Sequence, residues 1–445
     1  MGNNILIIGS GVSGVGAAKL SKHTKHNVRI TSTQKIRKVN KEIFYGLGID
    51  FEEGQNSISN LTWSNLIIKS PGVPSSIPLL TEARVQGIPI ISEIEFAFRF
   101  TKSNIIAITG TNGKTTTSKL LWYILSKSGL NVDLVGNIGR SFSESIVEKK
   151  FDNYVIELSS FQLEDIVEFR PNIAILLNIQ EDHLNRYNNN FEEYIRTKMK
   201  IQMNQNSQDQ FIYFANDSHI NNHLQNVIAN KYPFGDSKSH SNSYGAWLQK
   251  NKIIINTIKN NFTMTIHNLA LQGTHNYYNS MAASIAASSM GIKNEIIKKC
   301  LADFKGVEHR LEFVSKIAGV SFINDSKATN CNSVYYALDS INSPIIWICG
   351  GVDKGNNYSA LKKLVNDKVK SIIYLGTNSR KIKNTFKQDV DDIVVINTMD
   401  EAVNHSYKIA DSGDTILLSP ACASFDLFKN YEERGRAFKS CVSTI

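Results

Sequence analysis

The segment Thr109–Thr115, with the sequence TGTNGKT, constrains the fold of this chain more than any other feature. It follows an apolar run, Ile105–Ile108, and precedes a stretch whose apolar residues recur at helical spacing. A glycine-bent turn between a strand and a helix points backbone N–H groups at one spot, where the helix dipole also favours an anion. Lys114 can reach the β- and γ-phosphates of a nucleotide, and the Thr115 hydroxyl can bind Mg²⁺. Although Ile108 replaces the first glycine of the usual phosphate-binding loop, the segment predicts an ATP-binding site.

The length and composition indicate a multidomain globular protein. Its 445 residues correspond to roughly three domains at ~150 residues each, and its 20% of charged residues is ordinary for such a protein. No run of about 18 apolar residues occurs, no secretory signal pattern is present, and the five cysteines form no Cys-x-x-Cys pair. We therefore expect a cytoplasmic protein without a membrane segment, a zinc site or a disulfide framework.

The net charge of +9 raises the question of nucleic-acid binding. The lysines are scattered, however, and no basic helix or aromatic-interleaved basic stripe occurs, so we expect no nucleic-acid partner. One imbalance is local, because residues 1–41 hold eight Lys/Arg and no Asp or Glu. This imbalance is typical either of a solvated basic face or of a domain that receives an anionic ligand.

Residues 1–92 begin like a dinucleotide-binding domain but lack its acidic residue. The strand Asn4–Ile8 leads into Gly9–Gly14, which has the G-x-G-x-x-G pattern and opens a helix. The next strand ends in Ser32-Thr33-Gln34, where a carboxylate would bind the ribose of NAD. The pattern therefore predicts a diphosphate at a helix N-terminus and gives little support to a dehydrogenase. The loop Ser70–Pro74, after a further strand, is expected at the ligand-facing end of the same sheet.

Residues 93–304 alternate strands with helices around the phosphate-binding segment, which predicts a mostly parallel sheet. Glu157 ends a strand, and a carboxylate at that position beside a phosphate-binding strand is placed to bind Mg²⁺. His183 follows the next strand and is either a second metal ligand or an ordinary loop histidine. Lys198 lies on a polar helix, where a solvated lysine is the ordinary alternative. The stretch 205–270, rich in Asn and Ser, is expected to form an antiparallel elaboration.

Residues from about 305 onward resume the alternation and carry three polar clusters. We expect strands at Val320–Ile323, Ile345–Cys349, Ile372–Leu375 and Thr415–Leu418. The polar clusters follow three of these strands, at Asn324–Asn330, Gly350–Lys354 and Ser419–Ser424. Because the carboxyl ends of parallel strands share one edge of a sheet, the clusters are expected to converge on one crevice.

A series of short motifs resembles those of the Mur ligase and folylpolyglutamate synthase superfamily. In order, they are Gly110–Thr115, Asn137–Gly139, Glu157–Gln162, Glu181–Leu184, Gly273–Asn276, His309-Arg310 and Asp325–Asn330. The closing segments Ser419–Ser424 and Lys429–Gly435 are similar to those of the members that add D-glutamate. The resemblance covers essentially the whole chain and implies an α/β fold of three domains. These are a Rossmann-like domain over 1–92 for a UDP substrate, a P-loop ATPase-type parallel sheet over 93–304 with a small antiparallel elaboration, and a Rossmann-like domain over 305–445 for an amino acid.

The resemblance implies a nucleotide site, two Mg²⁺ ions and a set of catalytic residues. ATP would be bound by Gly110, Thr111, Asn112, Gly113, Lys114, Thr115, Thr116, Asn276, Arg310, Asp325 and Lys327. The metal ions would be held by Thr115, Glu157, His183 and Lys198, the last as a carbamate and with Lys200 as its competitor for that assignment. The catalytic residues would be Lys114, Lys198, His309, Lys327 and Lys354.

The resemblance also implies two small-molecule substrates, UDP-N-acetylmuramoyl-L-alanine and D-glutamate, joined by a monomeric ligase of peptidoglycan precursor synthesis. Their candidate contacts are Ser10, Gly11, Val12, Ser13, Ser32, Thr33, Ser70, Pro71, Gly72, Asn137, Ser159, His183, Thr329, Lys354, Ser424 and Tyr431. Two positions depart from the family pattern. Ser32 or Thr33 stands in place of an acidic residue at the uracil end, and Asn185 stands where Asp is common.

Three other functions stay open on the sequence. Another amide ligase of the superfamily would add a different amino acid or extend folate with glutamate, although the chain lacks the Asp-Asn-Pro-Arg motif of the diaminopimelate- or lysine-adding members. A degenerate nucleotide-binding protein would keep the phosphate loop and lose ligation, but it would not need the acceptor-side lysines Lys327 and Lys354. A dehydrogenase is suggested only by the first glycine loop.

Overall fold

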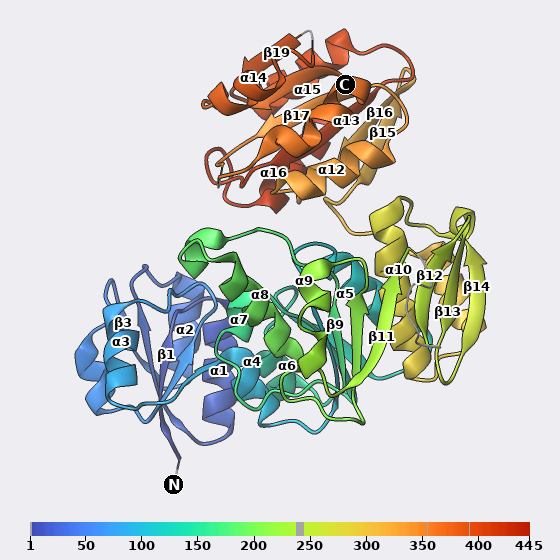
Figure 1. The fold of residues 1–445 in the computed structure, drawn as a ribbon. Coiled ribbons are helices and arrows are strands. Elements are labelled where there is room, and N and C mark those ends of the chain that lie inside the picture. The colour runs from blue at the N-terminus through green and yellow to red at the C-terminus, as the bar shows by residue number, and fades with distance from the viewer. Residues whose placement is uncertain (1, 237–243, 354, 391) are drawn as a thin grey trace. The chain divides into compact units, whose positions relative to one another are not determined.

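The computed structural model describes residues 2–236, 244–353, 355–390 and 392–445, so the predicted site residue Lys354 lies outside the described residues. Within these ranges the chain is an α/β protein with sheets of five, nine and six strands, which confirms the predicted fold class (Figure 1). No helix of the described ranges is long and apolar enough to cross a bilayer. Internal contacts separate two compact units, Met1–Leu269 with Tyr278–Phe304 and Ala270–Tyr277 with Lys305–Ile445. The three-domain boundaries that we expect at 92/93 and 304/305 stay a prediction.

The first sheet has the strand order β3-β2-β1-β4-β5, with every pair parallel. Its elements are β1 Asn4–Ile8, α1 Val12–His23, β2 Asn27–Ser32, α2 Lys38–Gly46, β3 Asp50–Glu53, β4 Leu66–Lys69, α3 Pro78–Val85, β5 Ile90–Ser92 and α4 Glu93–Phe98. Two glycines let α1 begin directly after β1. Gly9 has φ +101°, and a Cβ on Gly14 would lie 2.0 Å from the Gly9 carbonyl oxygen.

The central sheet has the order β14-β13-β12-β11-β10-β9-β6-β8-β7. Its strands are β6 Asn104–Thr109, β7 Val132–Gly136, β8 Asn153–Glu157, β9 Ile173–Leu176, β10 Gln210–Phe214, β11 Asn230–Gly235, β12 Gly245–Gln249, β13 Lys252–Asn256 and β14 Asn261–Thr265. Its helices are α5 Lys114–Lys127, α6 Phe142–Glu148, α7 Ser160–Leu163, α8 Phe191–Met199, α9 Ser218–Asn221, α10 Thr274–Ser289 and α11 Asn294–Asp303. The strands from β7 to β11 pair in parallel, which places their carboxyl ends at one edge.

The expected antiparallel elaboration at 205–270 is wrong in its first half. β10 pairs in parallel with both β9 and β11, so these strands extend the main sheet. The segment between β10 and β11, which includes α9, returns the chain to the same end of the sheet, as a parallel pair requires. Only β12, β13 and β14 form an antiparallel ribbon, in which short turns join consecutive strands.

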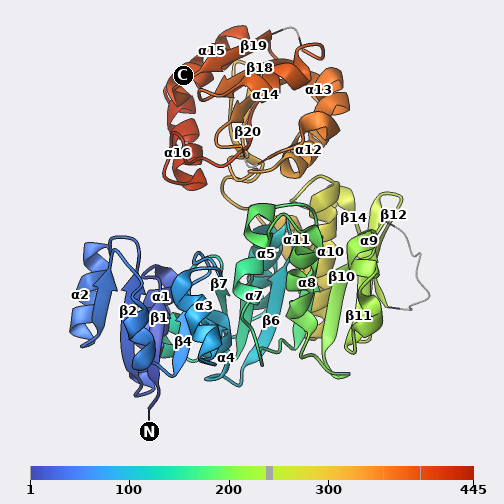
Figure 2. The same ribbon diagram turned by 60° about the vertical axis from the view of Figure 1, so that its left-hand side comes forward.

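The third sheet has the order β15-β16-β20-β17-β18-β19, and β15 is antiparallel to β16. Its elements are β15 Glu312–Ile317, β16 Val320–Asn324, α12 Cys331–Ser340, β17 Ile345–Gly350, α13 Lys362–Lys368, β18 Val369–Leu375, α14 Arg380–Phe386, β19 Asp392–Ile396, α15 Met399–Ile409, β20 Thr415–Ala421 and α16 Tyr431–Val442. Helices α12, α13 and α14 cover one face, and α15 and α16 cover the other (Figure 2). The four strands that we expected are confirmed. The edge strands β15 and β19 were not predicted. Polar residues interrupt the apolar pattern of β15, whereas β19 contains an apolar run, Ile393–Ile396, that sequence reasoning missed.

The first two sheets share one hydrophobic core, and α4 is fixed inside it. Ile7, Phe96 and Tyr154 belong to the same buried cluster although they come from the first sheet, α4 and the central sheet. Two carboxylates anchor α4. Glu95 Oε2 accepts the backbone N–H groups of residues 167–169 at 2.8–2.9 Å. Glu93 Oε1 accepts a backbone N–H at the start of α6 at 2.6 Å. These bonds hold the end of the first sheet against the central one.

Glu93 should make the stability of this unit depend on pH. Burial raises the pKa of Glu93 from 4.5 to about 7. A carboxyl with a raised pKa stabilises the fold fully below its unfolded pKa, and this contribution is lost as the pH rises through the folded pKa. Between about pH 5 and about pH 8, we expect the free energy of unfolding of wild type to fall by about 3 kcal/mol through this group. The variant Glu93→Gln cannot ionise there and should not show this loss. Urea unfolding of both proteins at the two pH values measures this difference, and parallel losses in both proteins would contradict it.

Candidate active site

The predicted phosphate-binding segment forms a loop between β6 and α5. Gly110 has φ +153° and Gly113 has φ +85°. A Cβ on Gly113 would lie 2.4 Å from Asn279 Oδ1, and one on Gly110 would lie 2.9 Å from Leu177 Cβ, so both positions favour glycine. α5 begins at Lys114, and the N–H groups of its first turn point out of the helix end, as phosphate binding requires.

Two N–H groups of this loop are used inside the protein. The Thr111 N–H donates to the Asn178 carbonyl at 2.9 Å, and the Asn112 N–H donates to Asn178 Oδ1 at 2.8 Å. Thr111 Oγ1 also lies 3.1 Å from the Tyr194 hydroxyl. The segment after β9 thus fixes the first half of the loop. The expectation that the N–H groups of this turn point at a phosphate does not hold for Thr111 and Asn112.

Lys114 and Lys198 meet at the carbonyl oxygen of Gly110. Lys114 Nζ donates to that oxygen at 2.9 Å, and Lys198 Nζ donates to it at 2.8 Å. Lys198 is 1% exposed and lies over the Tyr194 ring, so the alternative of a solvated lysine is wrong. Burial, together with the charge of Lys114, holds the pKa of Lys198 well below its usual value. This shift favours the neutral, nucleophilic amine.

Glu157 ends β8 beside the phosphate loop and has one oxygen to offer to a cation. Its Oε1 accepts from Asn137 Nδ2 at 2.8 Å. Its Oε2 is buried and makes no hydrogen bond among the residues that the structure describes. Thr115 and Thr116, in the first turn of α5, are buried as well. A buried carboxylate oxygen in this state fits a hard cation such as Mg²⁺.

His183 and Ser159 lie in loops at the carboxyl ends of β9 and β8. His183 has φ +53°, and its ring packs edge-on against Phe161 at 5.1 Å. The His183 backbone N–H donates to Asp182 Oδ1 at 2.9 Å. Ser159 forms a capping box with Gln162 at the start of α7. The structure thus gives Ser159 a local role and leaves its predicted contact with a substrate untested.

The predicted substrate residues of the first sheet lie at its carboxyl edge. Ser10–Ser13 form the start of α1, and Ser70–Gly72 form the turn after β4. Ser10 Oγ lies 3.5 Å from Ser32 Oγ at the end of β2, next to the exposed Thr33. Asn40 Nδ2, from α2, donates to the Ser10 carbonyl at 2.7 Å. The start of α1 is thus fixed by side chains of the next two elements.

A charged network joins the loop after β4 to the loop that carries His183. Lys69 is 1% exposed, and its Nζ lies 2.6 Å from Glu164 Oε2 and 2.8 Å from Asp165 Oδ2. Arg186 donates to both Glu164 oxygens, at 2.7 and 3.0 Å, and to the Val73 carbonyl at 2.8 Å. Burial disfavours the charged form of Glu164, but Arg186 and Lys69 outweigh it and hold its pKa below the usual value.

A cavity of about 740 Å³ opens beside this network. Its lining includes Ser75, Phe161, His183, Arg186 and Lys200. Lys200 Nζ donates to the Glu164 carbonyl at 2.6 Å, so its ammonium group does not share the Gly110 carbonyl with Lys198. A hollow of this size, with polar groups at the carboxyl ends of parallel strands, suits a small-molecule ligand.

Breaking the charged network should destabilise the protein strongly. We expect Glu164→Ala to lower the free energy of unfolding by about 3 kcal/mol, because Arg186 then loses its carboxylate partner and the buried Lys69 keeps only Asp165. Arg196→Ala, which breaks an exposed pair with Glu192, should cost less than ~1 kcal/mol. Urea unfolding of the two variants measures both changes. Equal losses would show that the buried network contributes no more than a surface pair.

In the second unit the polar clusters after β16, β20 and β17 lie side by side, because these strands are neighbours in the sheet. Ser419 Oγ donates to Asp325 Oδ2 at 2.9 Å, which joins the first cluster to the third. The Val352 N–H donates to the Ala423 carbonyl at 2.8 Å, which joins the second cluster to the third. The expected convergence is confirmed for the residues that the structure describes.

Asp325 and Arg310 form the charged part of these clusters. Burial raises the pKa of Asp325 to about 6, although the charge of Arg310 opposes the rise. Arg310 Nε is buried and makes no hydrogen bond within the described ranges. Burial and the same Arg310 charge lower the pKa of His275 to about 4. Asn276, the next residue, donates to the Gln272 carbonyl at 2.8 Å. His275 and Asn276 both lie in the first turn of α10, in the part of that helix that belongs to the second unit.

The candidate amino-acid residues lie around Lys327. Its N–H donates to the His309 carbonyl at 3.0 Å, and its Nζ lies over the Tyr431 ring at 5.2 Å. Thr329 follows in the same loop before α12, and Ser424 is buried after β20. Lys327, Thr329, Ser424 and Tyr431 therefore come from the loops that the sequence singles out, whereas their contacts with a substrate stay predictions.

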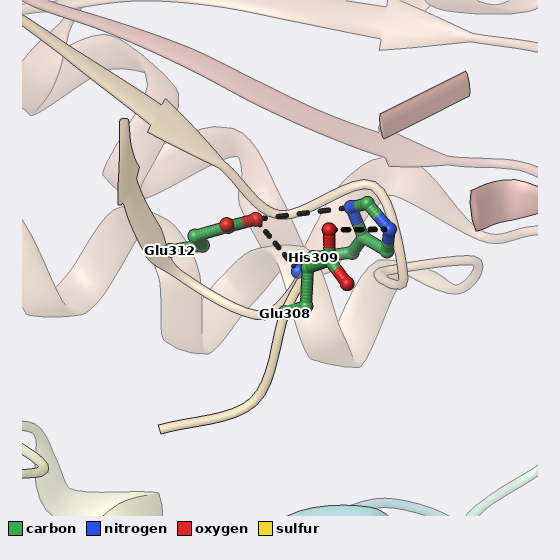
Figure 3. A group of neighbouring side chains, drawn as sticks. All are labelled: Glu308, His309 and Glu312. Atoms are coloured by element: carbon green, nitrogen blue, oxygen red, sulfur yellow. Dashed lines mark hydrogen bonds and ion pairs between the residues drawn. The ribbon is translucent and has the colours of Figure 1, made fainter. Parts of the chain in front are cut away.

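His309 lies inside the second unit between Glu308 and Glu312 (Figure 3). It is buried, and its Nδ1 accepts from Asn324 Nδ2 at 2.9 Å. Burial lowers the pKa of His309. Two carboxylates and an imidazole resemble the donor set of a metal site, but Lys439 Nζ lies 2.6 Å from Glu308 and 2.9 Å from Glu312 and forms an ion pair with each. The group is a salt-bridge cluster that fixes the histidine.

Sequence reasoning did not single out Lys69 and Asn178 in the first unit or Arg434 in the second. Arg434 stands inside the motif Lys429–Gly435 and Asn178 lies outside the motifs quoted above, but both act on main-chain atoms, and such partners leave no pattern in one sequence. Lys69 carries a usable signal. It ends the otherwise apolar strand β4 and is therefore placed to be buried and ion-paired.

Three domain models of one family match the chain. They are described as Mur ligase MurD-like, N-terminal domain, over residues 3–92; Mur ligase middle domain, over 108–287; and Mur ligase, glutamate ligase domain, over 309–422. The chain belongs to the Mur ligase family. Over its full length it is similar to curated UDP-N-acetylmuramoylalanine–D-glutamate ligases. That of Christiangramia forsetii is 45% identical over 447 residues and 100% of both chains, and that of Bacteroides fragilis is 45% identical over 444 residues and 99% of both chains.

Solved structures agree with the fold. The UDP-N-acetylmuramate-alanine ligase of Thermotoga maritima has a TM-score of 0.62 and 20% identity over 99% of both chains. A pseudomurein peptide ligase type C from Methanothermus fervidus has a TM-score of 0.62 and 21% identity, also over 99% of both chains. At such identities the likeness shows the fold alone, and it matches the three-sheet α/β architecture described above.

Proposed function

We propose that this chain is an ATP-dependent ligase that joins D-glutamate to UDP-N-acetylmuramoyl-L-alanine in peptidoglycan precursor synthesis. The observation that carries the proposal is the 45% identity, over the whole chain, to curated ligases named for that reaction. The site supports the same chemistry, because it combines a phosphate loop, a buried carboxylate and a desolvated lysine at one sheet edge.

The reaction must activate a carboxylate, which is a poor acyl donor. ATP transfers its γ-phosphoryl group to the terminal carboxylate of the alanyl substrate, giving an acyl phosphate and ADP. The neutral amine of D-glutamate attacks the acyl carbon. The C–N bond forms, the C–O bond to phosphate breaks, and the former amine loses a proton. Because little covalent chemistry is left to the protein, its residues position the reactants and stabilise charge.

The residues around the phosphate loop suit the first step. Lys114 exchanges its bonds to loop carbonyls for the γ-phosphate, and the N-terminus of α5 faces the anion. Mg²⁺ supplies charge neutralisation at the transferred phosphoryl group when bound. Thr115 and Glu157 would hold one ion. The buried Oε2 of Glu157, which makes no hydrogen bond to a described residue, supports this assignment. His183 and Lys198 as a carbamate would hold a second ion.

The desolvation of Lys198 supports its assignment as the carbamoylated lysine. In that reaction the neutral Nζ attacks CO₂, an N–C bond forms, and one proton is released, which turns a cation into a carboxylate. A depressed pKa provides the neutral amine that the reaction needs. Lys200, the competitor, points at the Glu164 carbonyl and is not fully buried.

The test of the function is phosphate release from Mg-ATP in the presence of UDP-N-acetylmuramoyl-L-alanine. D-Glutamate, L-glutamate, D-alanine, L-lysine and meso-diaminopimelate are added in turn. We expect release that depends on both the UDP substrate and D-glutamate. Release with another amino acid would indicate that this chain has the specificity of a different ligase of the family. ATP binding without release in every arm would indicate a degenerate nucleotide-binding protein. The monomeric state and the cytoplasmic location stay predictions.

A further inference from the structure

Arg434 lies at the centre of the three polar clusters of the second unit. It stands in the first turn of α16 and is 1% exposed. Its Nη2 donates to the carbonyls of Ser326, at 2.9 Å, and Cys422, at 3.1 Å. Its Nε donates to Ser326 Oγ at 3.1 Å, and its Nη1 donates to the Gly350 carbonyl at 3.5 Å. One guanidinium therefore contacts the loops after β16, β17 and β20 together.

The partners of Arg434 are unusual for a buried charge. Among the described residues no carboxylate forms an ion pair with it, and main-chain carbonyls take most of its hydrogen bonds. Burial lowers the pKa of Arg434 to about 10, which still leaves it charged at neutral pH. The charge of Asp426 favours the charged guanidinium, but no carboxylate of the described residues bonds to it directly. A buried cation in this situation is costly, and its direct partners, the main-chain carbonyls, indicate what it does.

Arginine suits this role because its donors form a rigid planar fork. A lysine ammonium is a point donor and cannot span carbonyls on three loops at once. A second hydrogen bond links the same loop to α16, because Ser326 Oγ donates to the Tyr431 carbonyl at 2.8 Å. Ser326 is thereby held to both Tyr431 and Arg434, and the loop that carries Lys327 and Thr329 is fixed to the start of α16.

We propose that Arg434 is a positioning residue that sets the spacing of these three loops and so shapes the site for the amino-acid substrate. This inference rests on the proposed function, since the loops carry the candidate D-glutamate contacts Thr329 and Ser424, and Tyr431 begins α16 beside them. Arg434 itself is buried and touches main chain, so it acts through the loops.

The test compares Arg434→Lys with Arg436→Lys, an exposed arginine two residues further along α16. The first readout is hydrogen–deuterium exchange of the full-length proteins. The N–H groups of Ala328, Val352 and Ala423 are hydrogen-bonded within or between the loops, and we expect all three to exchange faster in Arg434→Lys only. Faster exchange in one loop, or in none, would overturn the proposal.

The second readout is steady-state kinetics. We expect Arg434→Lys to raise the KM for D-glutamate about tenfold or more, with a change below about twofold in the KM for the UDP substrate. A lower thermal stability with unchanged KM for D-glutamate would overturn the positioning role. If wild type shows no D-glutamate dependence, the proposed function fails, whereas the exchange experiment still decides whether Arg434 couples the loops.

Discussion

Lys114→Ala should lower the turnover number by at least about 10²- to 10³-fold, with the protein still folded. In the proposed function the change removes a positive charge that would stabilise the transferred phosphoryl group, an effect worth about 3–4 kcal/mol. It also removes a charge that depresses the pKa of Lys198, so Lys198 becomes easier to protonate. Phosphate release under saturating Mg-ATP and both proposed substrates measures the effect.

Lys119→Ala is the matched control for Lys114→Ala. Lys119 lies on the same helix α5 but outside its first turn, so its loss should leave turnover within about twofold of wild type. Circular dichroism of both variants checks that the fold is kept. Near-normal turnover in Lys114→Ala would show that the loop after β6 does not bind the reacting phosphate.

Lys198→Ala should lower activity by at least about 100-fold, because it removes the side chain that we propose as a metal ligand once CO₂ has added to it. Wild type in CO₂-depleted buffer should gain activity when bicarbonate is added, since carbamate formation consumes CO₂. The gain should already appear at neutral pH, because the neutral Lys198 amine reacts and its depressed pKa keeps that form populated.

Lys200→Ala separates the two lysines near the end of α8. It should keep the response to bicarbonate, because Lys200 Nζ donates to the Glu164 carbonyl and does not reach the Gly110 carbonyl with Lys198. A flat bicarbonate response in wild type would count against a carbamate. A response that vanishes in Lys200→Ala would move the modification to that residue.

The strand–turn–helix context of the phosphate loop could be predicted because local residues determine it. Gly110 and Gly113 adopt positive φ, and the apolar run before them forms β6, as the spacing indicates. The convergence of the three later clusters could be predicted as well, since parallel strands end at one edge. The direction of the strands at 205–270 could not be predicted, because a short apolar run has the same pattern in a parallel and in an antiparallel strand.

The burial of Lys198 could not be predicted from the polar composition of its helix. Helix α8 has few apolar residues, but Lys198 stands four residues after the buried Tyr194 and so lies on its inner face. The roles of Asn178 and Arg434 are harder to predict, because their partners are main-chain groups of segments far apart in the chain. Such contacts exist only once the sheets have formed.

The core shared by the first two sheets has a practical consequence for anyone who would excise the first domain as a fragment. A cut at residue 92 would remove α4, whose Phe96 fills the core next to Ile7. It would also expose the apolar face of α1 that packs on α6. We therefore expect a truncated fragment to expose a contiguous hydrophobic surface to water and to aggregate. For the same reason, the segment matched by the N-terminal domain model, residues 3–92, is not expected to fold independently.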